Sequence, residues 1–382
     1  MDSRSDVLIV GGGPVGAALA GLLADSGLSV VLLEARSVDA TDPRSIALSY
    51  GSALLLQRIG AWEDALRDTP IESVHVSQHG GWGRALIRAR DQGVPALGYV
   101  CAYGAVHAAL AQRVRDAGGT VALRTGARAL GISAHPDHVE VQTEAGTQRT
   151  ADAARLVVLA DGGQVSAGLV DHRDHDYGQC AVVADIGCEP ANQGRAFERF
   201  CPPGPVALLP APGGYALVWT VPSRQAAALA GLPEQAFLAE LQEVFGERAG
   251  RFAHCGPRSV FPLRLRVARA PRAGRVLLLG NAAQTLHPVA GQGLNLGLRD
   301  ADALAALIRA QPGALDDPSL ARRFHAARRA DRLGTVAITD SLVRLFSNDL
   351  VPLRTLRGYG LTLLDVLPPA KHAFAQRMMF GG

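Results

Sequence analysis

Three glycines near the start of the chain have the spacing that binds the phosphates of a dinucleotide. Gly11, Gly13 and Gly16 follow an apolar run and precede a stretch rich in alanine and leucine, the pattern of a strand, a tight turn and a helix. The first glycine permits the turn, the second lets a pyrophosphate approach the backbone, and the third lets the helix pack against the strand. The first helical turn, with Pro14 and Val15, would present free N–H groups to the phosphates.

An acidic residue at the end of the next apolar run supports this interpretation. The run covers residues 28–33 and ends in Glu34. A carboxylate at this distance can bind the two hydroxyls of an adenosine ribose and repel a 2′-phosphate. Arg36 follows closely and is included in the expected cofactor-binding set. A strand–turn–helix without a ligand does not account for the acid at this spacing, but these residues leave open whether the dinucleotide is FAD or NAD.

A second glycine-rich segment lies late in the chain. Gly280 and Asn281 close an apolar strand, and residues 291–295 open a helix. Two glycines around one glutamine expose several backbone N–H groups toward an anionic or polar ring edge. The expected contact residues at this helix start are Gly291, Gln292, Gly293, Leu294 and Asn295.

A third turn, Asp161-Gly162, follows a buried strand in the middle of the chain. Nucleotide-binding features therefore occur at the start, the middle and the end of the sequence. Between the last two lies a block from about residue 175 to 261 that is rich in strands and broken by proline and glycine. This order predicts one discontinuous nucleotide-binding domain with an inserted sheet domain. Residues 44–60 are expected to be helical.

Composition excludes several classes of function. The chain has 382 residues and a formal charge of +3, too small to argue for nucleic acid. Its five cysteines form no C-x-x-C pair, and His172 and His175 lie in an acidic stretch that we interpret as a solvated loop, so no metal is expected. The N-terminus leaves no room for a signal peptide, and no apolar run reaches the roughly 20 residues that span a bilayer. A cytoplasmic protein is expected.

These motifs together resemble those of the class A flavoprotein aromatic hydroxylases. That family has an N-terminal G-x-G-x-x-G, a central Asp-Gly, and a late Gly-Asp followed by H-P-x-x-G-Q-G-x-N. Here Asn281 replaces the aspartate, and Arg44 matches the family's arginine that reaches the FAD. The ubiquinone-biosynthesis branch, in particular the 2-polyprenyl-6-methoxyphenol hydroxylases, is similar in residues 42–48, 194–200, 280–288, 339–342 and 345–348.

The resemblance implies an α/β, p-hydroxybenzoate-hydroxylase-like fold in three parts. The first is a Rossmann-type FAD domain, made of residues 1–70, 98–175 and 266–330. The second is an inserted β-rich substrate domain, made of residues 71–97 and 176–265. The third is a C-terminal helical segment, residues 331–382.

The resemblance also implies the reaction. NAD(P)H would bind transiently and reduce FAD, and O2 would then form a flavin C4a-hydroperoxide that hydroxylates a polyprenylated phenol. Two alternatives stay open: a flavin-dependent reductase or dehydrogenase acting on prenyl lipids, and a non-catalytic subunit of a biosynthetic assembly. Association with other quinone-biosynthesis enzymes is a further expectation.

Candidate catalytic and substrate residues are few. His287 has two interpretations, a proton relay from the phenol or a structural histidine that orients the turn at Pro288, and Pro288 should lie beside the flavin. Arg199 either faces the substrate or pairs with Glu198. Alternation along a strand places these two side chains on opposite faces, which weakens the pairing.

The chain departs from the family pattern in three places. Ser166 is one position late after Asp161-Gly162, with no arginine following, and Ala108-Ala109 replaces a Gln-Arg pair that often contacts the cofactor. Tyr103-Gly104 stands where relatives vary, and no role is assigned to it. The tail from residue 322 to 377 has an excess of basic residues among apolar positions. It fits either a helix packed on the FAD domain with a solvated arginine face, or a contact with the inner-membrane surface.

Overall fold

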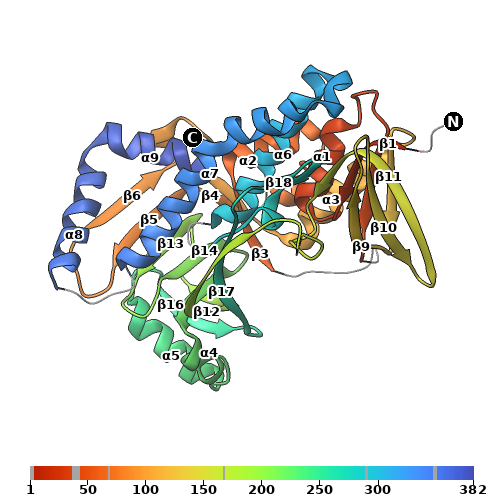
Figure 1. Ribbon diagram of the computed structural model, residues 1–382. Coiled ribbons are helices and arrows are strands. Elements are labelled where there is room, and N and C mark those ends of the chain that lie inside the picture. Colours follow the sequence, from red (N-terminus) through yellow and green to blue (C-terminus); the bar gives the residue numbers. More distant parts are fainter. Residues whose placement is uncertain (1–3, 37–43, 68, 167, 289–290, 347–350) are drawn as a thin grey trace.

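Two large sheets lie side by side in the computed structural model (Figure 1), which describes all residues except 1–3, 37–43, 68, 167, 289–290 and 347–350. The sheet at the right of the view carries α1 and α6, and the other carries α4 and α5. The long helix α7 runs over α6 on the first of these sheets, and α8 and α9 cover the outer part of the second sheet.

The first sheet has the order β18-β19-β11-β1-β2-β8, with β9 and β10 extending from β11. Its central strands are parallel and almost completely buried, which is typical of a sheet covered by helices. The strands are β1 (Ser5–Val10), β2 (Val30–Glu34), β8 (Val121–Thr125), β9 (Ala127–Ala134), β10 (Val139–Ala145), β11 (Gln148–Leu159), β18 (Arg272–Ala273) and β19 (Val276–Leu278). The helices that pack on them are α1 (Pro14–Leu23), α3 (Tyr103–Asp116) and α6 (Gln292–Ala310).

The second sheet has the order β20-β17-β12-β15-β14-β13-β5-β6, with β16 beside β12. One face packs against α4 and α5 through an aromatic core. The strands are β5 (Ser73–Gln78), β6 (Arg84–Arg88), β12 (His172–Glu189), β13 (Arg195–Phe200), β14 (Val206–Ala211), β15 (Gly214–Pro222), β16 (Arg251–Cys255), β17 (Ser259–Ala268) and β20 (Gln284–Thr285). The helices are α4 (Ser223–Ala230) and α5 (Glu234–Phe245).

A small third sheet joins the two halves. It consists of β3 (Ser45–Ser49), β7 (Gly98–Ala102) and β4 (Pro70–Ile71). The expectation of a helix from residue 44 is wrong for its first six residues, because β3 pairs along its whole length with β7. The helix α2 (Tyr50–Ile59) begins only after Ser49, whose hydroxyl accepts the N–H of Ser52.

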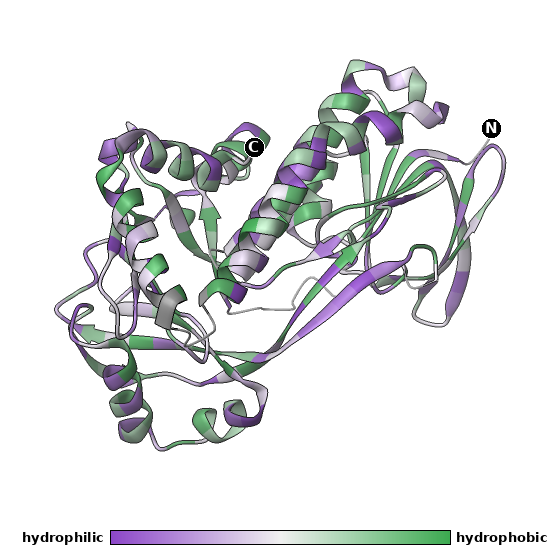
Figure 2. Ribbon diagram, turned by 60° about the vertical axis from the view of Figure 1, so that its left-hand side comes forward, coloured by the Kyte–Doolittle hydropathy of each residue, from purple (hydrophilic) through white to green (hydrophobic). Residues whose placement is uncertain are grey.

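The strand β12 links the parts of the molecule. It begins at His172, so the residues expected to form a polar loop are a strand paired with β17. Its first half is exposed and polar, and Figure 2 shows long hydrophilic strands crossing between the two halves of the molecule. The division of the chain into three units remains a prediction, which the separate sheets support.

The remaining elements are short 3-10 turns and three C-terminal helices. The turns are η1 (Asp64–Leu66), η2 (Arg90–Gln92), η3 (Gly280–Ala282) and η5 (Pro312–Asp316), and the helices are α7 (Pro318–Phe346), α8 (Val351–Val366) and α9 (Pro368–Phe380). The helix α7 packs on α6, whereas α8 packs on β5 and β6. Within the described part of the chain, no helix is long and apolar enough to cross a membrane.

Candidate FAD and substrate site

The first glycine turn is built as its sequence predicts. Gly11 has a φ of +104°, and a Cβ there would lie 2.6 Å from the carbonyl oxygen of Ala160. A Cβ at Gly16 would overlap the carbonyl oxygen of Gly11, so α1 can approach β1 only because this residue is glycine. Both positions serve the close packing of strand, turn and helix.

Gly13 has a different role. It is the N-cap of α1, and no side chain caps that helix end. The nearest atom to a Cβ at Gly13 is the Tyr103 hydroxyl, 3.5 Å away. The uncapped N–H groups at this end are therefore accessible to an anion, as a pyrophosphate site requires.

Glu34, the acid expected to bind a ribose, lies beside the first glycine turn. Glu34 ends β2, and its Oε2 would lie 2.9 Å from a Cβ at Gly12, so the carboxylate sits against the glycine turn. Its other oxygen accepts the N–H of Arg36 at 2.7 Å. Arg36 itself is exposed. The carboxylate is thus held in place at the position expected to bind the ribose hydroxyls.

The three glycine turns converge on one place. A Cβ at Gly11 would touch the Cα of Asp161 at 2.7 Å, which joins the first and central turns. On the other side of α1, Val15 contacts both Gly280 and Gly297, which would place Cβ atoms 3.2 and 2.7 Å from its side chain. Segments distant in sequence therefore form one site.

The central turn is held by its own aspartate. The carboxylate of Asp161 accepts the N–H groups of Gly163 and Val165, at 3.0 and 2.6 Å, and Gly162 has a φ of +77°. Ser166 is fully buried, and its hydroxyl donates to the carbonyl of Gly163 at 3.4 Å. The late serine therefore closes this turn from within.

The start of α6 presents an open backbone surface. Gly291 is its N-cap, in the left-handed conformation at φ +60°, with no side-chain cap. No atom lies within 4 Å of a Cβ built at Gly293. Gln292 is buried and donates to the carbonyl of Met378 at 3.3 Å, and Leu294 packs on the core around α1. The N–H groups at this helix start can therefore donate hydrogen bonds to the edge of a cofactor ring.

Asn295 holds the helix start in place. Its amide donates to the carbonyls of Gly291 and Ala47, at 2.8 and 3.0 Å, and its oxygen accepts the N–H of Ser49 and the hydroxyl of Ser52, at 2.8 and 2.7 Å. The side chain therefore ties α6 to β3 and α2. Any contribution to a cofactor comes through its backbone. The Asn281 side chain, in η3, is exposed.

Arg44 bridges the two halves beside these turns. Its guanidinium lies 5.3 Å from the ring centre of Tyr103 and 5.7 Å from that of Phe261 in the second sheet. The Tyr103 hydroxyl is also the neighbour of Gly13. This position agrees with an arginine that reaches the cofactor, as the resemblance implies.

His287 is buried next to the second sheet. Its ring makes an edge contact with Tyr177 of β12 at 5.3 Å, and the Tyr177 hydroxyl donates to Asp340 of α7 at 2.9 Å. Burial lowers the pKa of His287 to about 4, so its imidazole is neutral at pH 7. Pro288 is exposed. A neutral, weakly basic ring favours the structural interpretation of His287 over the proton relay.

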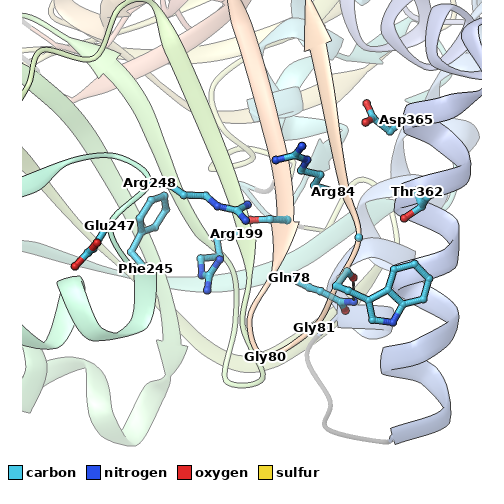
Figure 3. A pocket seen from close by; sticks show the side chains of 14 residues that line it. Gln78, Gly80, Gly81, Arg84, Arg199, Phe245, Glu247, Arg248, Thr362 and Asp365 are labelled. Atoms are coloured by element: carbon cyan, nitrogen blue, oxygen red, sulfur yellow. Dashed lines mark hydrogen bonds between the residues drawn. The ribbon is translucent and has the colours of Figure 1, made fainter.

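Arg199 lies in a separate pocket of about 630 Å³, between the β5–β6 hairpin, the end of α5, and α8 (Figure 3). Its Nε donates to the carbonyl of Val244 at 3.1 Å. Arg84 and Arg248 line the same pocket, together with the carboxylates of Glu247 and Asp365. The structure does not bring Arg199 together with the glycine turns.

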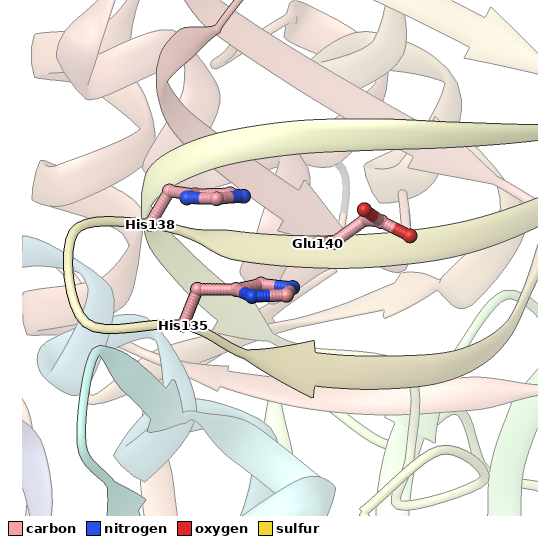
Figure 4. A group of neighbouring side chains, drawn as sticks. All are labelled: His135, His138 and Glu140. Carbon is pink, nitrogen blue, oxygen red and sulfur yellow. The ribbon is translucent and has the colours of Figure 1, made fainter.

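Three metal-ligating side chains meet on the β9–β10 hairpin (Figure 4). The ligand atoms of His135, His138 and Glu140 lie within 4.8 Å of one another, and the two imidazoles stack at 4.4 Å. Asp137 accepts from Nδ1 of His138 at 2.8 Å when that nitrogen is protonated, which leaves Nε2 as the ligand. The sequence analysis did not single out this group, which could hold a cation.

Comparison with known proteins agrees with this geometry. The family profile described as "FAD binding domain" matches residues 4–332. A ubiquinone hydroxylase, UbiL, of Rhodospirillum rubrum is 39% identical, over 99% of this chain and 90% of its own length. The chain belongs to the FAD-dependent aromatic hydroxylases of the ubiquinone-biosynthesis branch. The 3-demethoxyubiquinol 3-hydroxylase of Escherichia coli is 32% identical, over 94% of both chains.

The fold of this hydroxylase is also found among solved structures. The p-nitrophenol 4-monooxygenase PnpA of Pseudomonas putida superposes with a TM-score of 0.80 over 100% of this chain and 99% of the other, at 20% identity. The resemblance to the family and the predicted fold class are thereby confirmed. The protein is a flavin-dependent monooxygenase, and two uncapped helix ends that meet at converging turns fit its FAD.

Of two further residues of this site, His107 was not considered from the sequence and Tyr103 was considered without a role. Tyr103 and His107 lie one turn apart on α3, and Nε2 of His107 lies 2.9 Å from the carbonyl oxygen of Gly12. Their i, i+4 spacing near the start of a helix was the available signal, because such residues share one face. His107 directly precedes Ala108-Ala109, so a polar contact to the turn persists where the family's Gln-Arg pair is missing.

We expect Gly293→Val to fold normally and to lose FAD or slow its reduction. The position has no neighbour within 4 Å, and valine is a better helix former than glycine, so only a ligand in that space would clash. Gly360→Val in α8, which also has open space, is the matched control. Bound FAD and stopped-flow reduction are measured. Unchanged values in Gly293→Val would show that the flavin ring lies elsewhere.

Proposed function

We propose that this monooxygenase hydroxylates the ring of a polyprenylated phenol in ubiquinone biosynthesis, with NAD(P)H as reductant and O2 as co-substrate. The observation that carries the proposal is the convergence of three glycine turns in a chain similar to two ubiquinone-pathway hydroxylases. FAD, once reduced, supplies the chemistry that activates O2. The protein must bind the ring, orient it and exclude water.

The residues at the start of α6 are proposed to stabilise negative charge on the flavin. The backbone N–H groups of Gln292, Gly293 and Leu294 lie at an uncapped helix end, where the helix dipole favours an anion. Asn295 holds this helix start with four hydrogen bonds, two to β3, one to Ser52 of α2 and one to Gly291, so the donors are pre-oriented. Pro288 follows the buried His287 and is proposed to limit the space beside the ring.

The second sheet is proposed to form an apolar wall facing the flavin. A polyprenyl tail must leave through an opening, because pockets of about 300–1,000 Å³ cannot enclose a long chain. Each buried CH2 adds roughly 0.8 kcal/mol. Binding should therefore tighten as prenyl units are added and then reach a plateau.

This proposal is tested with a series of methoxyphenols of increasing prenyl length. We expect the bare head group to stimulate NAD(P)H oxidation but to yield mostly hydrogen peroxide, and longer chains to yield hydroxylated product. Product and peroxide are measured for each substrate. Tight, fully coupled turnover of a small polar phenol, with no gain from any prenyl unit, would contradict the assignment.

A membrane contact through α8 is proposed as the route for such a substrate. The helix exposes four large apolar side chains on one face, Leu356, Tyr359, Leu363 and Val366, each at least 56% exposed. Trp82 of the β5–β6 hairpin packs edge-on against Tyr359 at 4.7 Å and is itself half exposed. The arginine face expected on the tail is partly buried instead, because Arg328, Arg332 and Arg357 are inaccessible. What α8 presents is an apolar surface.

We expect Leu356→Glu and Leu363→Glu each to weaken binding to phosphatidylglycerol-containing vesicles by about thirtyfold, because burial of a leucine contributes roughly 2 kcal/mol. Leu333→Glu is the control, since that side chain is 58% exposed on α7. Vesicle flotation measures the bound fraction. If all variants float with the vesicles to the same extent, α8 does not contact the membrane.

A further inference from the structure

A carboxyl group lies on the apolar face of the second sheet. Glu198 is in β13, where it pairs with Val76 of β5 and Ala207 of β14, so these three side chains share one face. Arg199 points to the opposite face, where it bonds Val244 of α5. The expected alternation of the two residues thus separates them, and Glu198 lies on the side away from α4 and α5.

The surroundings of Glu198 are apolar. Its strand neighbours on the same face, Ala196 and Phe200, belong to clusters that include Ala375 of α9 and Leu361 of α8. Val76 packs in the second of these clusters. The carboxyl group therefore lies in an otherwise hydrophobic layer between the sheet and the C-terminal helices, which is an unusual place for a carboxylate.

One oxygen of this carboxyl group has no hydrogen bond within the described part of the chain. Its Oε1 is inaccessible to solvent and has no hydrogen-bond partner among the described residues, although the residue as a whole keeps some accessible surface. Part of the residue therefore borders open space. Burial raises the pKa of Glu198 to about 7, and no charged neighbour contributes to that shift. Burying a carboxyl oxygen without a hydrogen-bond partner is unfavourable, so this oxygen is a candidate contact for a ligand that donates a hydrogen bond.

The flavin-side turn is close to the same face. A Cβ at Gly291 would contact the Cβ of Ala47 at 3.3 Å, and Ala47 packs against the cluster that contains Ala196. Glu198 lies two residues beyond Ala196 on the same face of β13, about 7 Å along the strand. A contiguous set of packed residues thus connects the strand that carries the acid to the start of α6, to which we assign the flavin ring.

We propose that Glu198 binds the phenolic hydroxyl of the substrate and accepts its proton. This inference rests on the proposed function. The O–H bond breaks, the proton moves to the carboxylate, and the electron pair stays on the ring oxygen, where it increases the electron density of the ring. When the hydroxylated ring becomes aromatic again, the hydroxylated carbon loses its hydrogen as a proton to water, and the carboxyl group returns the phenolic proton to the ring oxygen. The apolar layer around the acid would bind the ring and the first prenyl unit.

Binding and turnover of two variants test this role. The probes are 2-methoxy-6-prenylphenol and its methyl ether, which lacks the hydroxyl proton. We expect wild-type protein to bind the phenol at least about tenfold more tightly than the ether, and Glu198→Ala to bind both alike, since a hydrogen bond to a charged group contributes this much. Glu198→Gln should keep most of the affinity and lose about 100-fold in kcat, because an amide cannot accept the proton.

Stability separates this role from a structural one. The folded-state pKa of Glu198 lies above its ordinary value, so its ionisation opposes folding as the pH rises through about 7. Glu198→Gln should therefore raise the Tm at pH 8 by a few degrees and much less at pH 5. A structural glutamate would instead lower the Tm when replaced. Glu243→Gln, exposed on α5, is the matched control and should change neither quantity.

The outcomes distinguish the two proposals. If wild-type protein does not hydroxylate the prenylated phenol, the proposed function fails. If it does, and Glu198→Gln and Glu198→Ala keep wild-type kcat and the preference for phenol over ether, the assignment of Glu198 is wrong. Loss of stability in Glu198→Gln at pH 8 would also overturn it.

Discussion

Replacement of Gly13 by valine is expected to abolish FAD binding while leaving the chain folded. A Cβ at this position meets only the Tyr103 hydroxyl, 3.5 Å away, and the backbone is extended, with φ −60° and ψ 174°. Valine tolerates that conformation. Its branched side chain would nevertheless lie where the pyrophosphate approaches the N-terminal end of α1. We expect FAD affinity to fall by at least about 100-fold, or about 2.7 kcal/mol.

The matched comparison is Gly16→Val, three residues away in the same motif. A Cβ there would overlap the carbonyl oxygen of Gly11, so this variant should fail to fold. Bound FAD is measured by absorbance after gel filtration, and folding by circular dichroism. If Gly13→Val retains stoichiometric FAD, the phosphates do not lie at the N-terminal end of α1.

Asp300→Asn is expected to destabilise the protein by about 3–5 kcal/mol, because it leaves buried arginines without their counter-charge. Asp300 is fully buried in α6 and accepts hydrogen bonds from Arg328 and Arg332 of α7, at 2.7 and 3.2 Å. Gln284 donates to it at 3.0 Å. Arg328 also pairs with the buried Asp331, which bonds Arg299 at 2.8 Å. This network anchors α7 to the FAD-binding sheet.

Asp302→Asn is the control for this stability prediction. Asp302 is two residues away, 40% exposed, and paired with the exposed Arg58 at 2.7 Å. Its replacement should cost less than about 1 kcal/mol. Urea unfolding, followed by circular dichroism, gives both values. Equal stabilities for the two variants would show that the buried network does not hold α7 in place.

Much of the cofactor site could be predicted because its signals are local. The glycine spacing around Gly11–Gly16 reports close approaches between residues that are neighbours in sequence, and Glu34 ends the next strand. The order of the three turns predicted that they share one discontinuous domain. It could not predict the contacts that join them, since the contact of Val15 with Gly280 joins segments 265 positions apart.

The tail and the substrate sheet were harder to predict, for a physical reason. The arginines of α7 indicated a solvated face, but their carboxylate partners lie on α6 and elsewhere on α7, and no local pattern reveals such pairing. Polar residues at the start of β12 concealed a strand, because an exposed strand lacks the apolar–polar alternation of a half-buried one. Glu198 was considered only as a partner of Arg199, and its importance depends on the helices that cover it.

The proposed hydroxylation is tested most directly by measuring whether an atom of O2 enters the product. The purified, FAD-loaded protein is supplied with NAD(P)H, a prenylated methoxyphenol and 18O2, and the product is analysed by mass spectrometry. If the protein hydroxylates the ring, we expect one 18O atom in the ring of the product, with O2 and NAD(P)H consumed together. A reduced or dehydrogenated prenyl lipid without 18O would contradict the proposed hydroxylation and would identify a different flavin-dependent reaction on this fold.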